Sequence, residues 1–152
     1  MKVYLASPLG FSELGDKDRF LFKERLTSLG HEVVDPWDTN FSTDLKNVTN
    51  PANALSEIIY GCNNLAYRIG RTNREALDCA DCVFAILDGQ ELDSGTVSEL
   101  GYAVGRGKKV YGYRGDFRDL GELIGIPFNL QVWYFIKSSG GKLFRSLDEI
   151  DF

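Results

Sequence analysis

Four carboxylate side chains lie within twelve residues, around two glycines, and could support catalysis by a carboxylate. They are Asp88, Glu91, Asp93 and Glu99. Like charges crowded beside a cleft shift one another's pKa, which is how enzymes prepare carboxylates as acids, bases or nucleophiles. This cluster therefore holds the first candidates for catalysis.

Two of these carboxylates also have ordinary structural explanations. Thr96 and Glu99 have the spacing of a capping box, in which the glutamate only accepts a hydrogen bond from a backbone N–H at the helix start. Asp93 has the residue type of a helix N-cap or a turn. Spacing alone leaves the catalytic and structural interpretations open.

Other kinds of chemistry lack their usual patterns. Cys79 and Cys82 form a C-x-x-C at the end of an expected helix, whereas redox pairs follow a strand at a helix start. A zinc site would need two more ligands, for which only Cys62 and His31 remain, and free cysteines more often serve as small buried hydrophobic residues. No phosphate-binding glycine loop is present, and the single histidine, His31, does not form a triad with a nucleophile. We therefore expect neither a metal site nor a cofactor.

Strands and helices alternate along the sequence, which predicts a doubly wound parallel α/β sheet in one domain, residues 1–152. The strongest strand, residues 82–87, is apolar on both faces and so belongs in the sheet centre. Residues 39–50 are polar and predict a loop, and residues 52–81 predict a helix with a break near Gly70. The other expected strands cover residues 3–6, 31–34, 109–113 and 142–145, and the other expected helices cover residues 18–29 and 96–106 and begin again near Leu130.

Open α/β sheets bind ligands beyond the carboxyl ends of their strands, so the residues after each strand are the expected site. These are residues 7–11, 35–40 and 88–99. Tyr4 and Trp37 could line such a cleft, or could serve as core or rim aromatics. The sequence thus predicts carboxylate chemistry in a cleft with aromatic walls.

Composition narrows the choice of partners. The net charge is −5 over 152 residues, with no basic run, which argues against nucleic acid as a partner. Three cysteines are too few for a disulfide framework and favour a reducing compartment. With neither a signal peptide nor a membrane span expected, the predicted location is the cytoplasm.

Five segments resemble the nucleoside 2-deoxyribosyltransferase family and together span nearly the whole chain. The most specific is residues 93–103, D-S-G-T-V-S-E-L-G-Y-A; the others are residues 1–9, 73–87, 107–108 and 129–131. The resemblance implies a flavodoxin-like fold and transfer of 2-deoxyribose between bases of 2'-deoxynucleosides, with retention. It also implies that Glu99 attacks C1', that Tyr4 orients Glu99, and that Asp93 and Asn129 contact the sugar hydroxyls.

The resemblance further implies a homo-oligomer, because Asn129 corresponds to a residue that a neighbouring subunit contributes. The aromatic C-terminal segment around Phe128, Trp133, Tyr134 and Phe135 favours the same expectation. The expected ligands are deoxynucleosides and free nucleobases. The expected substrate-binding residues are Phe11, Trp37, Asp38, Asn40, Asn73, Asp88, Gly95 and Asn129.

Asn73 departs from the family pattern, since some members have an aspartate near this position that assists base protonation. An amide is no general acid, so Asn73 only hydrogen-bonds the base, or the proton comes from Asp38, Asp88 or solvent. One alternative activity is hydrolysis of 2'-deoxynucleoside 5'-monophosphates, whose enzymes tend to carry serine at the positions of Asp93 and Asn129. The other is nucleoside binding without catalysis.

Overall fold

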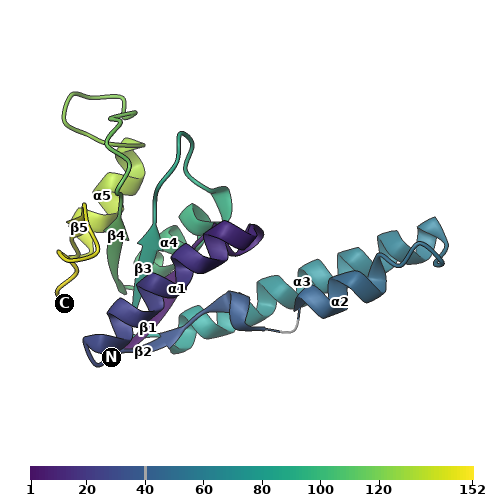
Figure 1. Cartoon of the computed structure of the whole chain (residues 1–152). Coiled ribbons are helices and arrows are strands. Elements are labelled where there is room, and N and C mark those ends of the chain that lie inside the picture. Colours follow the sequence, from purple (N-terminus) through teal and green to yellow (C-terminus); the bar gives the residue numbers. More distant parts are fainter. Residues whose placement is uncertain (40) are drawn as a thin grey trace.

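A computed structural model of the chain describes residues 1–39 and 41–152. Their five strands form one parallel sheet (Figure 1). The strand order is β2-β1-β3-β4-β5, the doubly wound order of flavodoxin-like folds. All residues of β3 are buried, which confirms the predicted central strand. The strands are β1 (Lys2–Ala6), β2 (Glu32–Val34), β3 (Cys82–Ile86), β4 (Lys109–Tyr113) and β5 (Leu143–Phe144).

Helices cover both faces of the sheet. The first is α1 (Glu13–Ser28), whose Phe22 and Leu26 pack on the face formed by Val3, Leu5 and Phe84. The opposite face of the sheet, with Tyr4 and Val83, packs against α4 (Ser94–Gly105), α5 (Leu130–Ser138) and the end of α3 (Leu55–Cys79). Because side chains alternate along a strand, Tyr4 necessarily faces α4 while its neighbours face α1.

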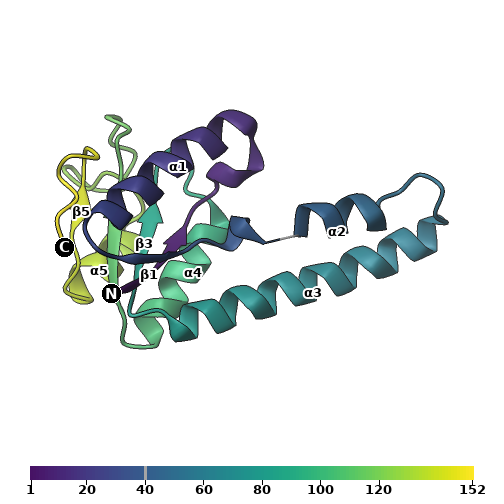
Figure 2. The same ribbon diagram turned by 60° about the horizontal axis from the view of Figure 1, so that its bottom comes forward.

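The segment before β3 differs from the prediction. The expected loop at residues 39–50 contains a helix, α2 (Phe41–Val48), and α3 continues through Gly70 without a break. The helices α2 and α3 lie side by side and form an arm that extends away from the sheet (Figure 2). Phe41, Leu45 and Val48 have the i, i+4, i+7 spacing of an amphipathic helix, and this was the overlooked signal.

No helix in residues 1–39 or 41–152 is both long enough and apolar enough to cross a membrane.

Candidate active site

Three elements bring a carboxylate, a phenol and an amide together beyond the sheet. The Tyr4 hydroxyl, from β1, donates a hydrogen bond of 2.6 Å to Oε1 of Glu99 on α4. The Asn73 Nδ2 group, from α3, donates to the same oxygen at 3.2 Å. Both hydrogen bonds use Oε1, which fixes the carboxylate and leaves Oε2 as the oxygen able to attack a ligand.

The helix start shows that Glu99 is not a capping residue. Asp93 is the N-cap of α4, and its Oδ2 accepts hydrogen bonds from the Thr96 backbone N–H at 2.7 Å and the Thr96 hydroxyl at 2.9 Å. Glu99 lies almost two turns further on and faces Tyr4. The capping-box interpretation is therefore wrong for Glu99, whereas the N-cap interpretation of Asp93 is confirmed.

Burial is the largest influence on the pKa values of this group. It raises the pKa of Glu99, as does nearby Asp93, whereas the hydrogen bonds from Tyr4 and Asn73 lower it. Burial, followed by the charge of Glu99, also raises the pKa of Tyr4 well above its usual range. The phenol consequently stays protonated and remains a hydrogen-bond donor to the carboxylate.

We expect Glu99→Gln to stabilise the protein at neutral pH. Because the pKa of Glu99 is higher in the folded state, the folded protein binds more protons, and stability falls as pH rises from the unfolded pKa through the folded one. Glutamine has no charge to bury, so the melting temperature of the variant should exceed the wild-type value at pH 7. The increase is about 2–4 °C for each kcal/mol gained in unfolding free energy. The difference should shrink below about pH 4, where both side chains are neutral. Calorimetry at several pH values measures it, and a variant less stable at pH 7 would contradict the expectation.

We expect Tyr4→Phe to shift the acid limb of the activity profile to higher pH. The hydroxyl donates to the ionised carboxylate, so its loss raises the pKa of Glu99 further. If Glu99 acts as a nucleophile, its carboxylate must be ionised, and the acid limb in kcat/KM then follows its pKa. Tyr111→Phe is the matched control, because Tyr111 packs on the other face of the sheet. Identical limbs in the Tyr4→Phe variant and the wild type would show that the hydroxyl does not act on the carboxylate.

A cavity of about 430 Å³ opens directly in front of Glu99. That volume falls within the range of small-molecule sites. Its charged lining residues are acidic, Asp93 and Glu99, and no lysine or arginine is among the described residues that line it. The remaining lining residues are Ser7, Phe11, Pro36, Trp37, Thr39, Phe41, Ser42, Leu45, Leu65, Ile69, Asn73, Gly95 and Thr96.

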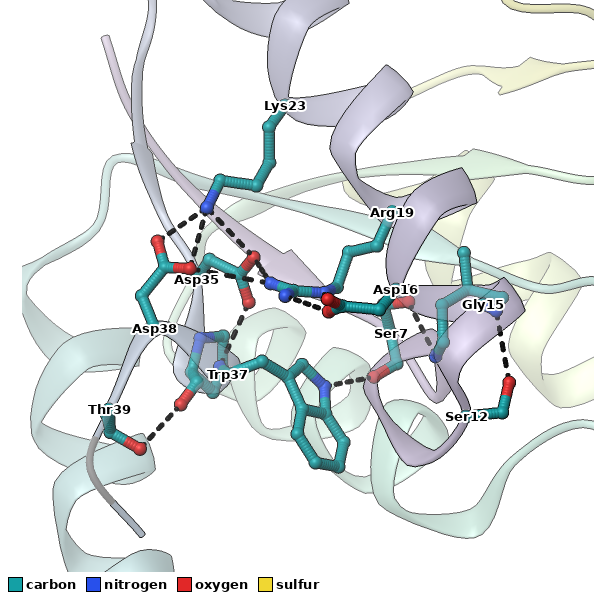
Figure 3. A network of polar contacts seen from close by, with 12 residues as sticks. Ser7, Ser12, Gly15, Asp16, Arg19, Lys23, Asp35, Trp37, Asp38 and Thr39 are labelled. Atoms are coloured by element: carbon teal, nitrogen blue, oxygen red, sulfur yellow. Dashed lines mark hydrogen bonds and ion pairs between the residues drawn. The ribbon is translucent and has the colours of Figure 1, made fainter. Parts of the chain in front are cut away.

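Trp37 and Phe11 form an aromatic wall of this cavity. Their rings meet edge to face, with centroids 4.6 Å apart. The indole N–H of Trp37 donates to the Ser7 carbonyl at 2.8 Å (Figure 3), and its ring covers Gly10, where a Cβ would lie 2.1 Å from the indole. The position of the indole thus depends on glycine at residue 10.

A charged network holds the turn that carries Trp37 (Figure 3). The buried Asp35 carboxylate accepts from the Trp37 backbone N–H at 3.0 Å and pairs with Arg19. Lys23 donates to Asp38 Oδ1 at 2.7 Å and lies 3.4 Å from Asp35. Asp38, which was expected to bind the base, is therefore paired with Lys23 of α1. It is not among the residues that line the cavity.

Asp88 and Asn129 are likewise not among the residues that line the cavity of this chain. Asp88 accepts a hydrogen bond from the Asp116 backbone N–H at 2.9 Å. Asn129 is exposed and caps α5, and its Nδ2 donates to Glu122 at 3.0 Å. Asn40 lies outside the described residues. The structure does bring together Tyr4, Phe11, Trp37, Asn73, Asp93, Gly95 and Glu99.

Sequence reasoning missed the apolar lining of the cavity on the arm. Phe41 and Leu45 come from α2, whose residues had been assigned to a loop. Leu65 and Ile69 precede Asn73 at four-residue intervals on α3. That spacing places all three on one helix face and was the available signal.

Comparisons with known proteins identify the family and relatives of similar fold. The sequence profile of nucleoside 2-deoxyribosyltransferases matches residues 3–131. A 2-deoxyribosyltransferase from Bacillus psychrosaccharolyticus has a TM-score of 0.59 at 25% identity, covering 100% of this chain and 93% of that one. A conserved protein from Enterococcus faecalis V583 has a TM-score of 0.69 at 24% identity, covering 98% and 93%. A CMP N-glycosidase from Clostridium botulinum has a TM-score of 0.50 at 16% identity, covering 98% and 93%. No curated protein matches the sequence.

Proposed function

Because the chain belongs to the nucleoside 2-deoxyribosyltransferase family, we propose that it transfers 2-deoxyribose between bases of 2'-deoxynucleosides through an ester on Glu99. The observation that carries the proposal is the carboxylate of Glu99, held through Oε1 by Tyr4 and Asn73 at the wall of an aromatic-sided cavity. Such an arrangement orients a carboxylate for nucleophilic attack.

In the first step, Oε2 of Glu99 attacks C1' of the deoxynucleoside. The C1'–N bond breaks, its electron pair leaves with the base, and the base takes up a proton. In the second step a nitrogen of another base attacks C1' and loses its proton, and the ester electron pair returns to Glu99. Two displacements at one carbon retain the configuration.

Solvent is the source of the proton that we favour. Asn73 donates its amide to Glu99 and has no acidic proton. Asp38 is paired with Lys23, and Asp88 accepts a hydrogen bond from the Asp116 backbone N–H. Neither carboxylate is among the described residues that line the cavity. Water that enters with the base supplies the proton in this scheme.

Asp93 is suited to a neutral sugar hydroxyl. Its hydrogen bonds within the described chain use Oδ2, so Oδ1 can accept from the 5'-hydroxyl of the sugar. A phosphate about 4 Å from this carboxylate would cost about 1 kcal/mol per charge pair even in water. We therefore expect the substrates to be nucleosides and not nucleotides. Hydrolysis of 2'-deoxynucleoside 5'-monophosphates is the second candidate activity.

We also propose that a neighbouring subunit completes the site with Asn129. The residues before Asn129 expose large apolar side chains, with Phe117 at 88% and Leu123 at 63% exposure. Exposed apolar surface of this kind favours contact with a partner. Phe128, which the sequence suggested for that contact, is instead buried in the core of its own chain.

Incubation of the protein with a deoxynucleoside and a second free base tests the activity. We expect the new deoxynucleoside to exceed free 2-deoxyribose, because a positioned base has an effective molarity above that of solvent water, about 55 M. A parallel reaction with the 5'-monophosphate should be slower. Release of free sugar as the main product at saturating purine and pyrimidine acceptors would overturn the transferase proposal, and preference for the monophosphate would favour the hydrolase.

A further inference from the structure

The cavity extends along the arm beyond the reactive carboxylate. Leu65, Ile69 and Asn73 line it at four-residue intervals on one face of α3. At 1.5 Å per residue, Ile69 lies about 6 Å and Leu65 about 12 Å along the helix from Asn73, which contacts Glu99. The row therefore leads from the reaction centre to a distal end near Leu65.

The opposite wall of this distal end comes from α2. Asp44 pairs with Arg68 at 2.9 Å, and Val48 lies against Gly61, so the two helices run antiparallel. This register places Leu45, between Asp44 and Val48, opposite the stretch of α3 that contains Leu65. Leu45 and Leu65 both line the cavity, so its distal end is apolar on two sides.

We propose, on the basis of the proposed function, that this distal end binds an apolar substituent on the base. A base joined to C1' at Glu99 occupies the part of the cavity next to Ile69 and the aromatic wall, and it is too short to reach Leu65. An unbranched alkyl group on the base edge away from the glycosidic nitrogen reaches that end. The preferred substrate class is therefore alkyl-substituted flat bases and their deoxynucleosides.

The test compares adenine, N6-propyladenine and N6-(2-hydroxyethyl)adenine as acceptors at a fixed donor. Burial of each methylene in an apolar site should raise kcat/KM about threefold to fourfold, so the propyl base should exceed adenine by at least tenfold. The hydroxyethyl base has nearly the same length and should gain far less, because its hydroxyl finds apolar neighbours. A kcat/KM for N6-propyladenine no greater than that for adenine would overturn the proposal. It would indicate that another part of the protein fills the distal end of the cavity.

Leu45→Asp tests the location of the subsite. A carboxylate at this position should abolish the propyl-to-adenine preference, and the ratio normalises for any general loss of activity. Leu55→Asp is the matched control, because Leu55 begins α3 at the tip of the arm, is 72% exposed and does not line the cavity. The control should keep the preference; equal ratios in the two variants would contradict the assignment.

Binding separates this proposal from the proposed function. Calorimetric titration with the same three bases, without a donor, needs no turnover. Tighter binding of the propyl base with no transfer to any base would support the subsite and overturn the activity. Transfer to adenine with no gain in affinity or rate for the propyl base would support the activity and overturn the subsite.

Discussion

Glu99→Ala should reduce transfer by about a thousandfold or more while the protein stays folded. Tyr4 and Asn73 both donate hydrogen bonds to this carboxylate at the cavity wall, and loss of the proposed covalent nucleophile costs far more than the 1.4 kcal/mol that a tenfold change represents. Initial rates of new nucleoside formation measure the effect. Mass spectrometry of the wild-type protein quenched with donor alone should show one added deoxyribosyl group, absent from the variant.

Glu91→Ala is the matched control for this substitution. Glu91 is an exposed carboxylate in the loop before α4 and does not line the cavity. Its loss should leave the rate within a factor of about two, as is usual for a surface substitution. A Glu99→Ala variant that keeps more than a tenth of the wild-type rate would exclude Glu99 as the nucleophile.

A mixture of two impaired variants, Glu99→Ala and Asn129→Ala, should regain activity that neither has alone. If each site takes its Asn129 from a partner, a mixed dimer holds one site with both residues intact. Random exchange of equal amounts makes half of the dimers mixed, so about a quarter of all sites recover. Asn129→Ala alone should lose about 10-fold to 100-fold, the effect of one buried hydrogen bond.

The experiment mixes the variants under conditions that permit subunit exchange and follows transfer with time. Glu99→Ala mixed with Glu99→Gln is the control, because no arrangement of these chains restores a carboxylate. Light scattering reports the oligomer directly. Activity that equals the mean of the separate variants, or a fully active wild-type monomer, would show that Asn129 does not act across an interface.

The sheet could be predicted from the sequence because its signals are local. Residues 82–87 are apolar without interruption, and such a run has few alternatives to a buried strand. Gly30 and Gly107 each follow a helix with φ of 83° and 75°, a left-handed backbone that favours glycine, and glycine directly after an apolar periodic segment is a local signal of a helix end. The helix α2 escaped prediction because it buries no residue and packs only one narrow face on α3, so its composition resembles that of a loop.

The site was predictable in part. Ligands bind beyond the carboxyl ends of the strands in open α/β sheets, and this pointed to Asp93, Glu99 and Trp37, which line one cavity. The contact from Asn73 to Glu99 depends on the direction in which α3 crosses the sheet, which no local pattern specifies. The pairing of Asp38 with Lys23 could not be predicted for a similar reason, because Lys23 lies fifteen residues away on another helix.

One part of the site lies against the buried core, and the other part lies on a helix with no buried residue. Tyr4 is buried in the core and donates a hydrogen bond to the partly buried Glu99 on α4, whereas part of the cavity wall belongs to α2, which buries no residue. Amides in α2 should therefore exchange with solvent by local opening, long before those of β1 and β3. Substitutions in α2 cost little folding free energy, whereas truncation of the fully buried side chains next to Glu99, such as Tyr4 and Leu100, would cost several kcal/mol. In the proposed reaction, substitutions in α2 would therefore alter the choice of base at little cost to the fold, while the residues that hold Glu99 and act on the sugar stay the same.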